Sequence, residues 1–218
     1  MPNWCDNALS LYFNTKDEKQ VKFIKGLIKS IEKKHELLNY LYPMPSHQPD
    51  LLKSNAFNRD GLKFPKDFPL EEQKAIEKMF GSNNWYDWSN ANWGTKWEVS
   101  SIDINDLNDT LDDIKRGDGT SALYIFFNSA WVPPIQAIQN SKIRDLGIDY
   151  NLEFYESGQG FIGHFRNGEL REAELNIPED IRKSRKKLQS FFEKLFEEKG
   201  INLDLIDHFC LIDNYIED

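Results

Sequence analysis

The chain has 218 residues, of which 39% are hydrophobic and 13% aromatic, and this content excludes wholesale disorder. Its longest apolar runs, such as ALYIFF, are only strand-sized, and its N-terminal residues lack the basic and apolar regions of a signal peptide, so we expect a cytoplasmic protein without a membrane span. The net charge is −9, and residues 101–218 carry 13 Lys and Arg against 23 Asp and Glu, which disfavours general nucleic-acid binding.

A strand and a helix open the predicted fold. Residues 7–13 place Leu9, Leu11 and Phe13 on one face, as in a half-buried strand. Apolar residues recur at helical spacing in the next segment, TKDEKQVKFIKGLIKSIEKK, and Thr15 is a suitable N-cap for it.

The regular pattern stops between residues 40 and 92. Prolines are frequent in LYPMPSHQPDLL and FPKDFP, and proline can neither donate a backbone hydrogen bond nor continue a helix. Only LEEQKAIEKMF, residues 70–80, has helical periodicity. We therefore predict a loop-rich insertion over residues 40–92 that contains one helix.

Regular elements return after the insertion. They are a strand over 93–104, an amphipathic helix over 105–117, a strand over 121–127, a helix over 135–147, a strand over 149–157, a hairpin over 160–175 and a helix over 178–199. The hairpin turns at Asn167-Gly168, the pair that best tolerates a type I′ turn. Gly117 and Gly200 are suitable C-caps for two of the helices.

The order of these elements predicts a fold class. Without the insertion, and with the acidic helix over 105–117 taken as a local elaboration, it is β-α-β-β-α-β, which is the split βαβ plan of an α+β, ferredoxin-like antiparallel sheet with both helices on one face. A hairpin and a C-terminal helix follow. We expect a ferredoxin-like domain over residues 1–177, and a helical extension over 178–218 that packs on the same domain.

Four sequence blocks carry a resemblance to a known family. MPNWCDNALSL, NWGTKWEVS, FNSAWVPP and YESGQGFIGHF occur in this order between residues 1 and 165. Together they resemble the YubB-type ferredoxin-like family of phage, plasmid and bacterial proteins. The resemblance implies the ferredoxin-like fold and a mobile-element or bacterial origin. It implies no catalytic residues, because the family has no established activity.

Several tryptophans flank the predicted core strands, so they could meet at one end of the sheet. One interpretation is a structural plug that anchors the insertion, because indole rings bury large areas. The other is an aromatic pocket or partner-binding patch with polar groups beside it. The residues of this candidate site are Trp4, Asn92, Trp93, Lys96, Trp97 and Trp131.

Single-stranded nucleic-acid binding is the alternative function. Aromatic side chains on central strands of this topology can stack on bases, although core filling or cover by the C-terminal segment would hide them. IRKSRKK, residues 181–187, is the densest basic run, and acidic neighbours favour a salt-bridged surface there. The residues of this alternative are Tyr12, Tyr124, Arg182, Arg185 and Lys186.

The remaining motifs predict no metal, cofactor or catalytic residue. The acidic segment 103–118 lacks the ligand spacing of a calcium loop, but it could dock a basic partner. Cys5 and Cys210 have no zinc-type spacing and are expected to be free thiols. An enzyme would need a polar cleft around His164 and Glu156, and no nucleophile motif accompanies them.

The leading hypothesis is a non-enzymatic binding or interaction module that engages a host protein. Its expected contact surface is the tryptophan-rich end of the sheet or the acidic segment. The sequence assigns no oligomeric state.

Overall fold

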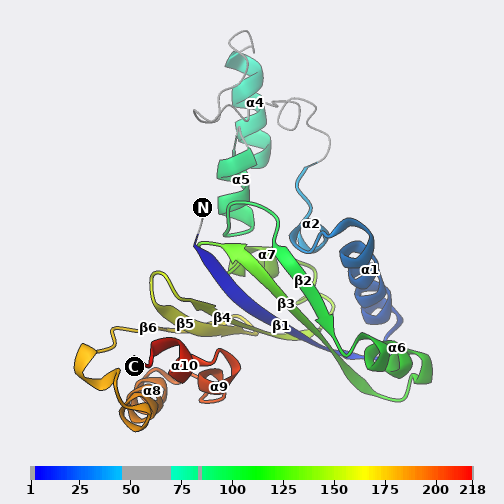
Figure 1. Ribbon diagram of the computed structural model, residues 1–218. Coiled ribbons are helices and arrows are strands. Elements are labelled where there is room, and N and C mark those ends of the chain that lie inside the picture. The colour runs from blue at the N-terminus through cyan, green and yellow to red at the C-terminus, as the bar shows by residue number, and fades with distance from the viewer. Residues whose placement is uncertain (1–2, 46–69, 83–84, 218) are drawn as a thin grey trace.

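The strands form one sheet. The structure, a computed structural model, describes residues 3–45, 70–82 and 85–217. Six antiparallel strands lie in the order β2-β3-β1-β4-β5-β6 (Figure 1). Their bounds are β1 Trp4–Asn14, β2 Ser100–Asn105, β3 Thr120–Ala130, β4 Asp149–Glu156, β5 Phe161–Arg166 and β6 Glu169–Glu174.

The first four strands have the predicted split βαβ arrangement. β1 lies between β3 and β4, and β3 separates β1 from β2. Leu9 of β1 is opposite Ile125 on one side and Leu152 on the other. The prediction of an α+β, ferredoxin-like fold is therefore confirmed, and the β5–β6 hairpin extends the sheet beyond β4.

Helices cover both faces of the sheet unequally. They are α1 Glu18–Lys34, α2 Leu38–Leu41, α4 Leu70–Phe80, α5 Trp85–Asn92, α6 Leu107–Arg116, α7 Ile135–Asn140, α8 Arg185–Lys199, α9 Leu205–His208 and α10 Leu211–Tyr215, with a 3-10 turn η1 at Glu179–Ile181. Apolar residues of α1 and α7, among them Ile24, Ile28 and Ile138, share the main core with Leu9 and Leu11 of β1.

The C-terminal helices pack on the opposite face, over the hairpin side of the sheet (Figure 1). Tyr155 and Ile162 of β4 and β5 form a second cluster with Phe192 and Phe196 of α8. The face over β2, β3 and β1 is therefore covered only in part, and we call it the open face.

Local interactions explain where some predicted elements start and stop. Asp17, not Thr15, caps α1, since its carboxylate accepts hydrogen bonds from the N–H groups of Lys19 and Gln20. Thr15 instead donates its hydroxyl to the Gly119 carbonyl, which ties the end of β1 to the start of β3. The helix predicted over 135–147 ends at Asn140, and turns follow it.

The strand predicted over 93–104 begins only at Ser100. Its first residues instead belong to a loop, in which Gly94 has a φ of 82° and the Trp93 carbonyl accepts a hydrogen bond from Ala137. A Cβ at Gly94 would meet only the flexible end of the Gln136 side chain, so the positive φ is the reason that glycine is favoured here.

The C-terminal segment also differs from its prediction. The hairpin turn at Asn167-Gly168 is confirmed, with φ angles of 47° and 97°. The helix predicted from Pro178 begins only at Arg185, where the Ser184 hydroxyl accepts from the Lys187 N–H. Helices α9 and α10 lie in the predicted helical extension, but their bounds were not predicted, because each is too short to have a periodic pattern.

The predicted insertion contains more helix than its sequence suggests. The helix at 70–80 is confirmed, but α5 is a second one within the described part of the insertion. The proline-rich residues 46–69 lie outside the described residues. No helix within the described ranges is both long and apolar enough to cross a membrane.

Candidate functional site

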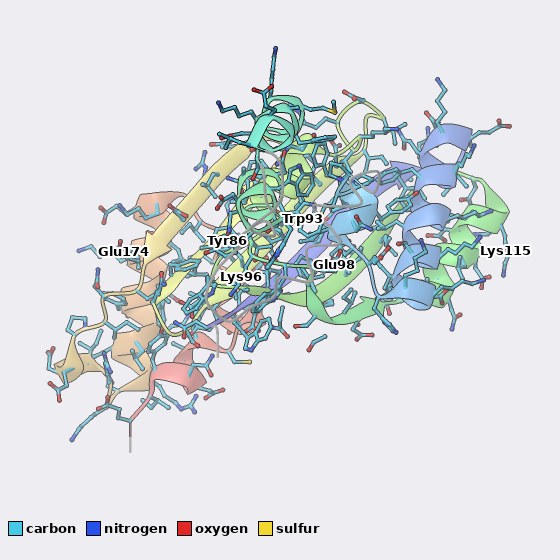
Figure 2. The ribbon with its side chains drawn as sticks, turned by 90° about the horizontal axis from the view of Figure 1, so that it is seen from above. Tyr86, Trp93, Lys96, Glu98, Lys115 and Glu174 are labelled. Carbon is cyan, nitrogen blue, oxygen red and sulfur yellow. The ribbon has the colours of Figure 1, made fainter. Side chains whose placement is uncertain are left out.

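Trp93 is part of the core and not of a surface patch. Its side chain is 5% exposed, and its Nε1 donates a hydrogen bond of 2.8 Å to the Tyr42 carbonyl. Its ring meets Trp88 edge-on at 5.5 Å, and Trp88 stacks on Tyr42. Figure 2 shows Trp93 near the middle of the molecule. This geometry supports the structural-plug interpretation for Trp93, because the ring joins both ends of the insertion.

The polar residues of the predicted patch have internal partners. Asn92 donates to the Trp88 carbonyl at 2.9 Å. The Lys96 ammonium lies 4.5 Å from the centroid of the Trp97 ring and 5.7 Å from that of Tyr86 (Figure 2). Cation–π contacts of this kind stabilise the conformation of the loop, so Asn92 and Lys96 both have partners within the chain.

Glu98 connects the segment that follows the insertion to the segment that precedes it. Its carboxylate accepts hydrogen bonds from the backbone N–H groups of Leu37, Leu38, Asn39 and Val99, at 2.8–3.2 Å. Burial raises the pKa of Glu98, while these N–H donors act to lower it. The carboxylate thus satisfies backbone donors at the start of α2 that would otherwise have no partner. No sequence motif pointed to this residue.

Exposed apolar residues remain where β1 begins and β3 ends. Trp4 and Trp131 are each 41% exposed and Val132 is 39% exposed. The Trp131 N–H donates to the Asn3 carbonyl, which holds the two chain segments side by side. We call Trp4, Trp131 and Val132 the tryptophan end. Trp4 and Trp131 belong to the patch that the sequence predicted, and Val132 lies beside Trp131 in the chain.

A groove of about 940 Å³ begins at Val132 and runs to β6 and α8. We call it the edge groove. Its apolar lining includes Ile135, Phe161, Phe191 and Leu195. Its acidic lining is Glu172, Glu174 and Glu198, and Lys199 is the one cation among the described lining residues. The groove therefore combines an apolar floor with a mainly negative rim. Sequence reasoning missed it, because its walls come from distant segments.

The open face of the sheet carries the two predicted aromatic residues of the nucleic-acid alternative. Tyr12 and Tyr124 are 38% and 36% exposed, and their rings meet edge-on at 6.5 Å. The C-terminal segment covers only the neighbouring Phe126, on which the His208 ring stacks at 5.8 Å. The expectation that core filling or the C-terminal segment hides these aromatics is thus wrong for both tyrosines.

The basic run does not lie on a single helix, although a helix was predicted over residues 178–199. Arg182 precedes α8, and it pairs with Glu217 at 3.3 Å and donates to the Ile177 carbonyl. Arg185, the first residue of α8, pairs with Asp213. Lys186 is exposed beside them. The acidic C-terminal segment therefore neutralises two of the three predicted phosphate contacts, as expected for a salt-bridged surface.

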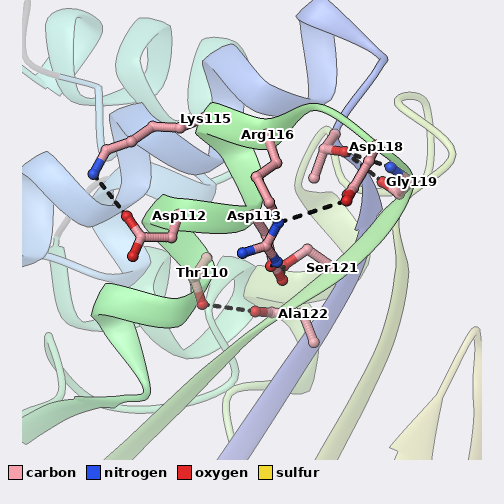
Figure 3. Close-up of polar contacts among 10 residues, drawn as sticks. Thr110, Asp112, Asp113, Lys115, Arg116, Asp118, Gly119, Ser121 and Ala122 are labelled. Atoms are coloured by element: carbon pink, nitrogen blue, oxygen red, sulfur yellow. Dashed lines mark hydrogen bonds and ion pairs between the residues drawn. The ribbon is translucent and has the colours of Figure 1, made fainter.

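The acidic helix is neutralised in a similar way. Asp112 pairs with Lys115 at 2.7 Å, and Asp113 pairs with Arg116, which also lies 3.5 Å from Asp118 (Figure 3). The Ser121 hydroxyl donates to Asp113 and anchors α6 on β3. Much of the acidic charge of α6 is therefore satisfied within the chain.

The geometry contradicts a shared cleft for His164 and Glu156. His164 is opposite Glu153 in the β4–β5 pairing, so Glu156, three residues later on β4, points to the other face. The Glu156 carboxylate is buried and accepts from the N–H groups of Gly158 and Gln159. Within the described ranges, no group of three or more His, Cys, Asp or Glu is arranged to hold a metal.

His164 is expected to make the fold sensitive to acid. Burial lowers its pKa, and the charges of Arg171 and Arg166 lower it further. Because the folded chain then binds this proton less readily than the unfolded chain, stability falls as the pH falls below about 6.5. The urea midpoint of the wild type should drop more between pH 7 and pH 5 than that of His164→Gln. Equal drops would contradict this role.

Comparisons with known proteins add little to this geometry. No family model matches the chain, and no curated protein matches it. Among solved structures, the crystal structure of the protein api92 from Yersinia pseudotuberculosis, of family model DUF1281, is similar to it. The sequence identity is 11% and the TM-score 0.39, over 82% of this chain and 99% of that chain. This likeness is too distant to carry an argument about function.

Proposed function

We propose that the chain is a non-enzymatic binding module that contacts a protein partner through the tryptophan end and the edge groove. The observation that carries this proposal is the exposure of Trp4, Trp131 and Val132, of which Val132 also lines the groove. Exposed aromatic side chains beside a concave apolar surface are typical of interaction sites, and tryptophan is enriched among the residues that dominate binding energy.

The charges of the groove indicate what kind of segment fits. Glu172, Glu174 and Glu198 line a groove whose floor is apolar, so a segment with apolar residues flanked by Lys or Arg complements it. The net charge of −9 favours the approach of such a basic partner. A partner from the host of a mobile element remains our proposal for its source, and it rests on the YubB-type resemblance.

A cytoplasmic location is part of the same proposal. Cys5 and Cys210 are both free, although one is buried and the other exposed. Free thiols are typical of proteins in a reducing compartment.

Single-stranded nucleic-acid binding stays a prediction with less support. Tyr12 and Tyr124 are exposed enough to stack on bases. However, Arg182 and Arg185 already pair with carboxylates, and phosphate binding depends on available cations. A titration with RNA and DNA oligonucleotides at low salt would test it, and the alternative requires binding that weakens steeply as salt is added.

The protein-binding proposal is tested with variants of the tryptophan end. A partner isolated from the native host should bind Trp131→Ala at least about tenfold more weakly, because an exposed tryptophan at an interface centre typically contributes this much. Affinity would be measured by calorimetry with the purified partner. Met79→Ala is the matched control, since Met79 is also exposed and apolar but lies on α4. Unchanged affinity of Trp4→Ala and Trp131→Ala would refute this contact surface.

A further inference from the structure

A second hollow lies on the open face, over the middle part of β1 and β3. It measures about 270 Å³. Its floor is formed by β1, β3 and β4, and its wall is the segment between α8 and the end of α9. The residues that matter for its chemistry are Tyr12, Tyr124, Phe126, Asn151, Glu153, Asp204 and His208. We call this hollow the tyrosine trough.

The polar groups of the trough lack a strong cation. The Glu153 carboxylate accepts a hydrogen bond of 3.0 Å from the Asn151 side chain, and Asp204 accepts one from Asn202. Among the residues that the structure describes, no Lys or Arg forms an ion pair with either carboxylate. Arg166 is opposite Asn151 in the sheet but does not line the trough.

One buried acceptor in the trough has no donor. The side-chain oxygen of Asn151 is buried, and no hydrogen-bond donor within the described ranges reaches it. A buried acceptor without a partner is costly, so a ligand that brings N–H groups would satisfy this oxygen once the Asn151 side chain turns toward the trough that it lines. Burial also raises the pKa of Glu153, while the nearby His208 and the Asn151 amide act to lower it. A cation placed beside Glu153 would remove the cost of burying its charge.

The aromatic groups of the trough suit a flat cation. Tyr12 and Tyr124 stand perpendicular to one another and are exposed, so ring surface remains free for a ligand. The faces of aromatic rings attract cations, and guanidinium groups stack on them most often. Two further carboxylates flank the floor, since Asp103 is opposite Phe126 and Asp149 is opposite Tyr12.

We propose that the tyrosine trough binds the guanidinium group of an arginine in a basic segment of a protein partner. The guanidinium would stack on the tyrosines, pair with Glu153 and donate to the Asn151 oxygen, which a planar group with five N–H donors can do together. This site goes beyond the tryptophan end and the edge groove. It would bind a charged side chain of the partner, whereas those surfaces would bind apolar side chains.

The experiment uses the isotope-labelled full chain and a short glycine peptide with a central arginine. NMR titration at low salt should shift the ring signals of Tyr12 and Tyr124 and the side-chain amide signal of Asn151. Glu153→Gln should weaken peptide binding at least about tenfold, because it removes a charge-assisted hydrogen bond. Glu179→Gln is the matched control, since it makes the same change at an exposed glutamate on η1.

Each outcome decides the proposal. Loss of binding in Glu153→Gln, with retention in Glu179→Gln and in Trp131→Ala, supports it and separates it from the tryptophan end. Equal binding by the corresponding lysine peptide would overturn the assignment to a guanidinium. Shifts confined to another surface, no shifts at all, or unchanged binding in Glu153→Gln would overturn the site. Because Gln keeps the shape of Glu153 without its buried charge, the variant should fold, and a thermal melt checks this.

Discussion

Trp93→Ala is expected to lower the free energy of unfolding by about 3–5 kcal/mol, the range found when a large buried aromatic side chain is truncated. Trp93 is 5% exposed and contacts Trp88 edge-on. Its indole N–H also satisfies the Tyr42 carbonyl, so truncation leaves that buried acceptor without a partner in addition to a cavity. Urea unfolding followed by circular dichroism would measure the loss.

The control for this prediction is another tryptophan of the same predicted cluster. Trp131 is 41% exposed, so Trp131→Ala should change the free energy of unfolding by less than about 1 kcal/mol. A loss of similar size in both variants would contradict the division between a buried plug and an exposed patch. A small loss in Trp93→Ala alone would show that the insertion is anchored by other contacts.

Glu98→Ala is expected to cost about 3 kcal/mol, because it leaves several half-buried backbone N–H groups without an acceptor. The Glu98 carboxylate is shared among the N–H groups of Leu37, Leu38, Asn39 and Val99. Glu98→Gln should lower the free energy of unfolding by less. The Gln carbonyl oxygen can still accept some of these hydrogen bonds, whereas its NH2 group is itself a donor and cannot accept any. Chemical denaturation of the two variants beside the wild type would test this order.

Hydrogen exchange can also show which part of the fold Glu98→Ala destabilises. Hydrogen exchange should accelerate at Leu38 and Asn39 in Glu98→Ala, while the amides of β1 keep their protection, because Glu98 acts on α2 and not on the central sheet. Glu179→Gln, an exposed glutamate with no role in capping α2, should leave both the stability and this exchange unchanged. Unchanged exchange at α2 in Glu98→Ala would refute the proposed role of the carboxylate.

The residue types in the sequence did not show which of these residues would lie on a surface. Tryptophans gather in the sequence near residue 90, which suggested one patch. In the structure Trp93 is buried, whereas Trp4 and Trp131 stay exposed because they lie where β1 begins and β3 ends. Likewise, the basic run near residue 182 meets Asp213 and Glu217 from the end of the chain, a pairing that no local pattern reveals.

By itself, the sequence determined the elements whose cause is local. Alternation at Leu9, Leu11 and Phe13 predicted β1, and the turn residues Asn167 and Gly168 predicted the hairpin, because side-chain direction and backbone preference depend on neighbours along the chain. The order of these elements then sufficed for the ferredoxin-like class, since few topologies accept it.

Only the tertiary structure decided which surfaces remain available for binding. The delayed start of β2 follows from the contact of Trp93 with α7, and the burial of Glu98 follows from the position of α2. The tyrosine trough exists because the C-terminal helices cover Phe126 but stop short of Tyr12 and Tyr124. Each of these features brings together segments that are far apart in the chain. Burial depends on all of these segments at once, so no local sequence pattern predicts it.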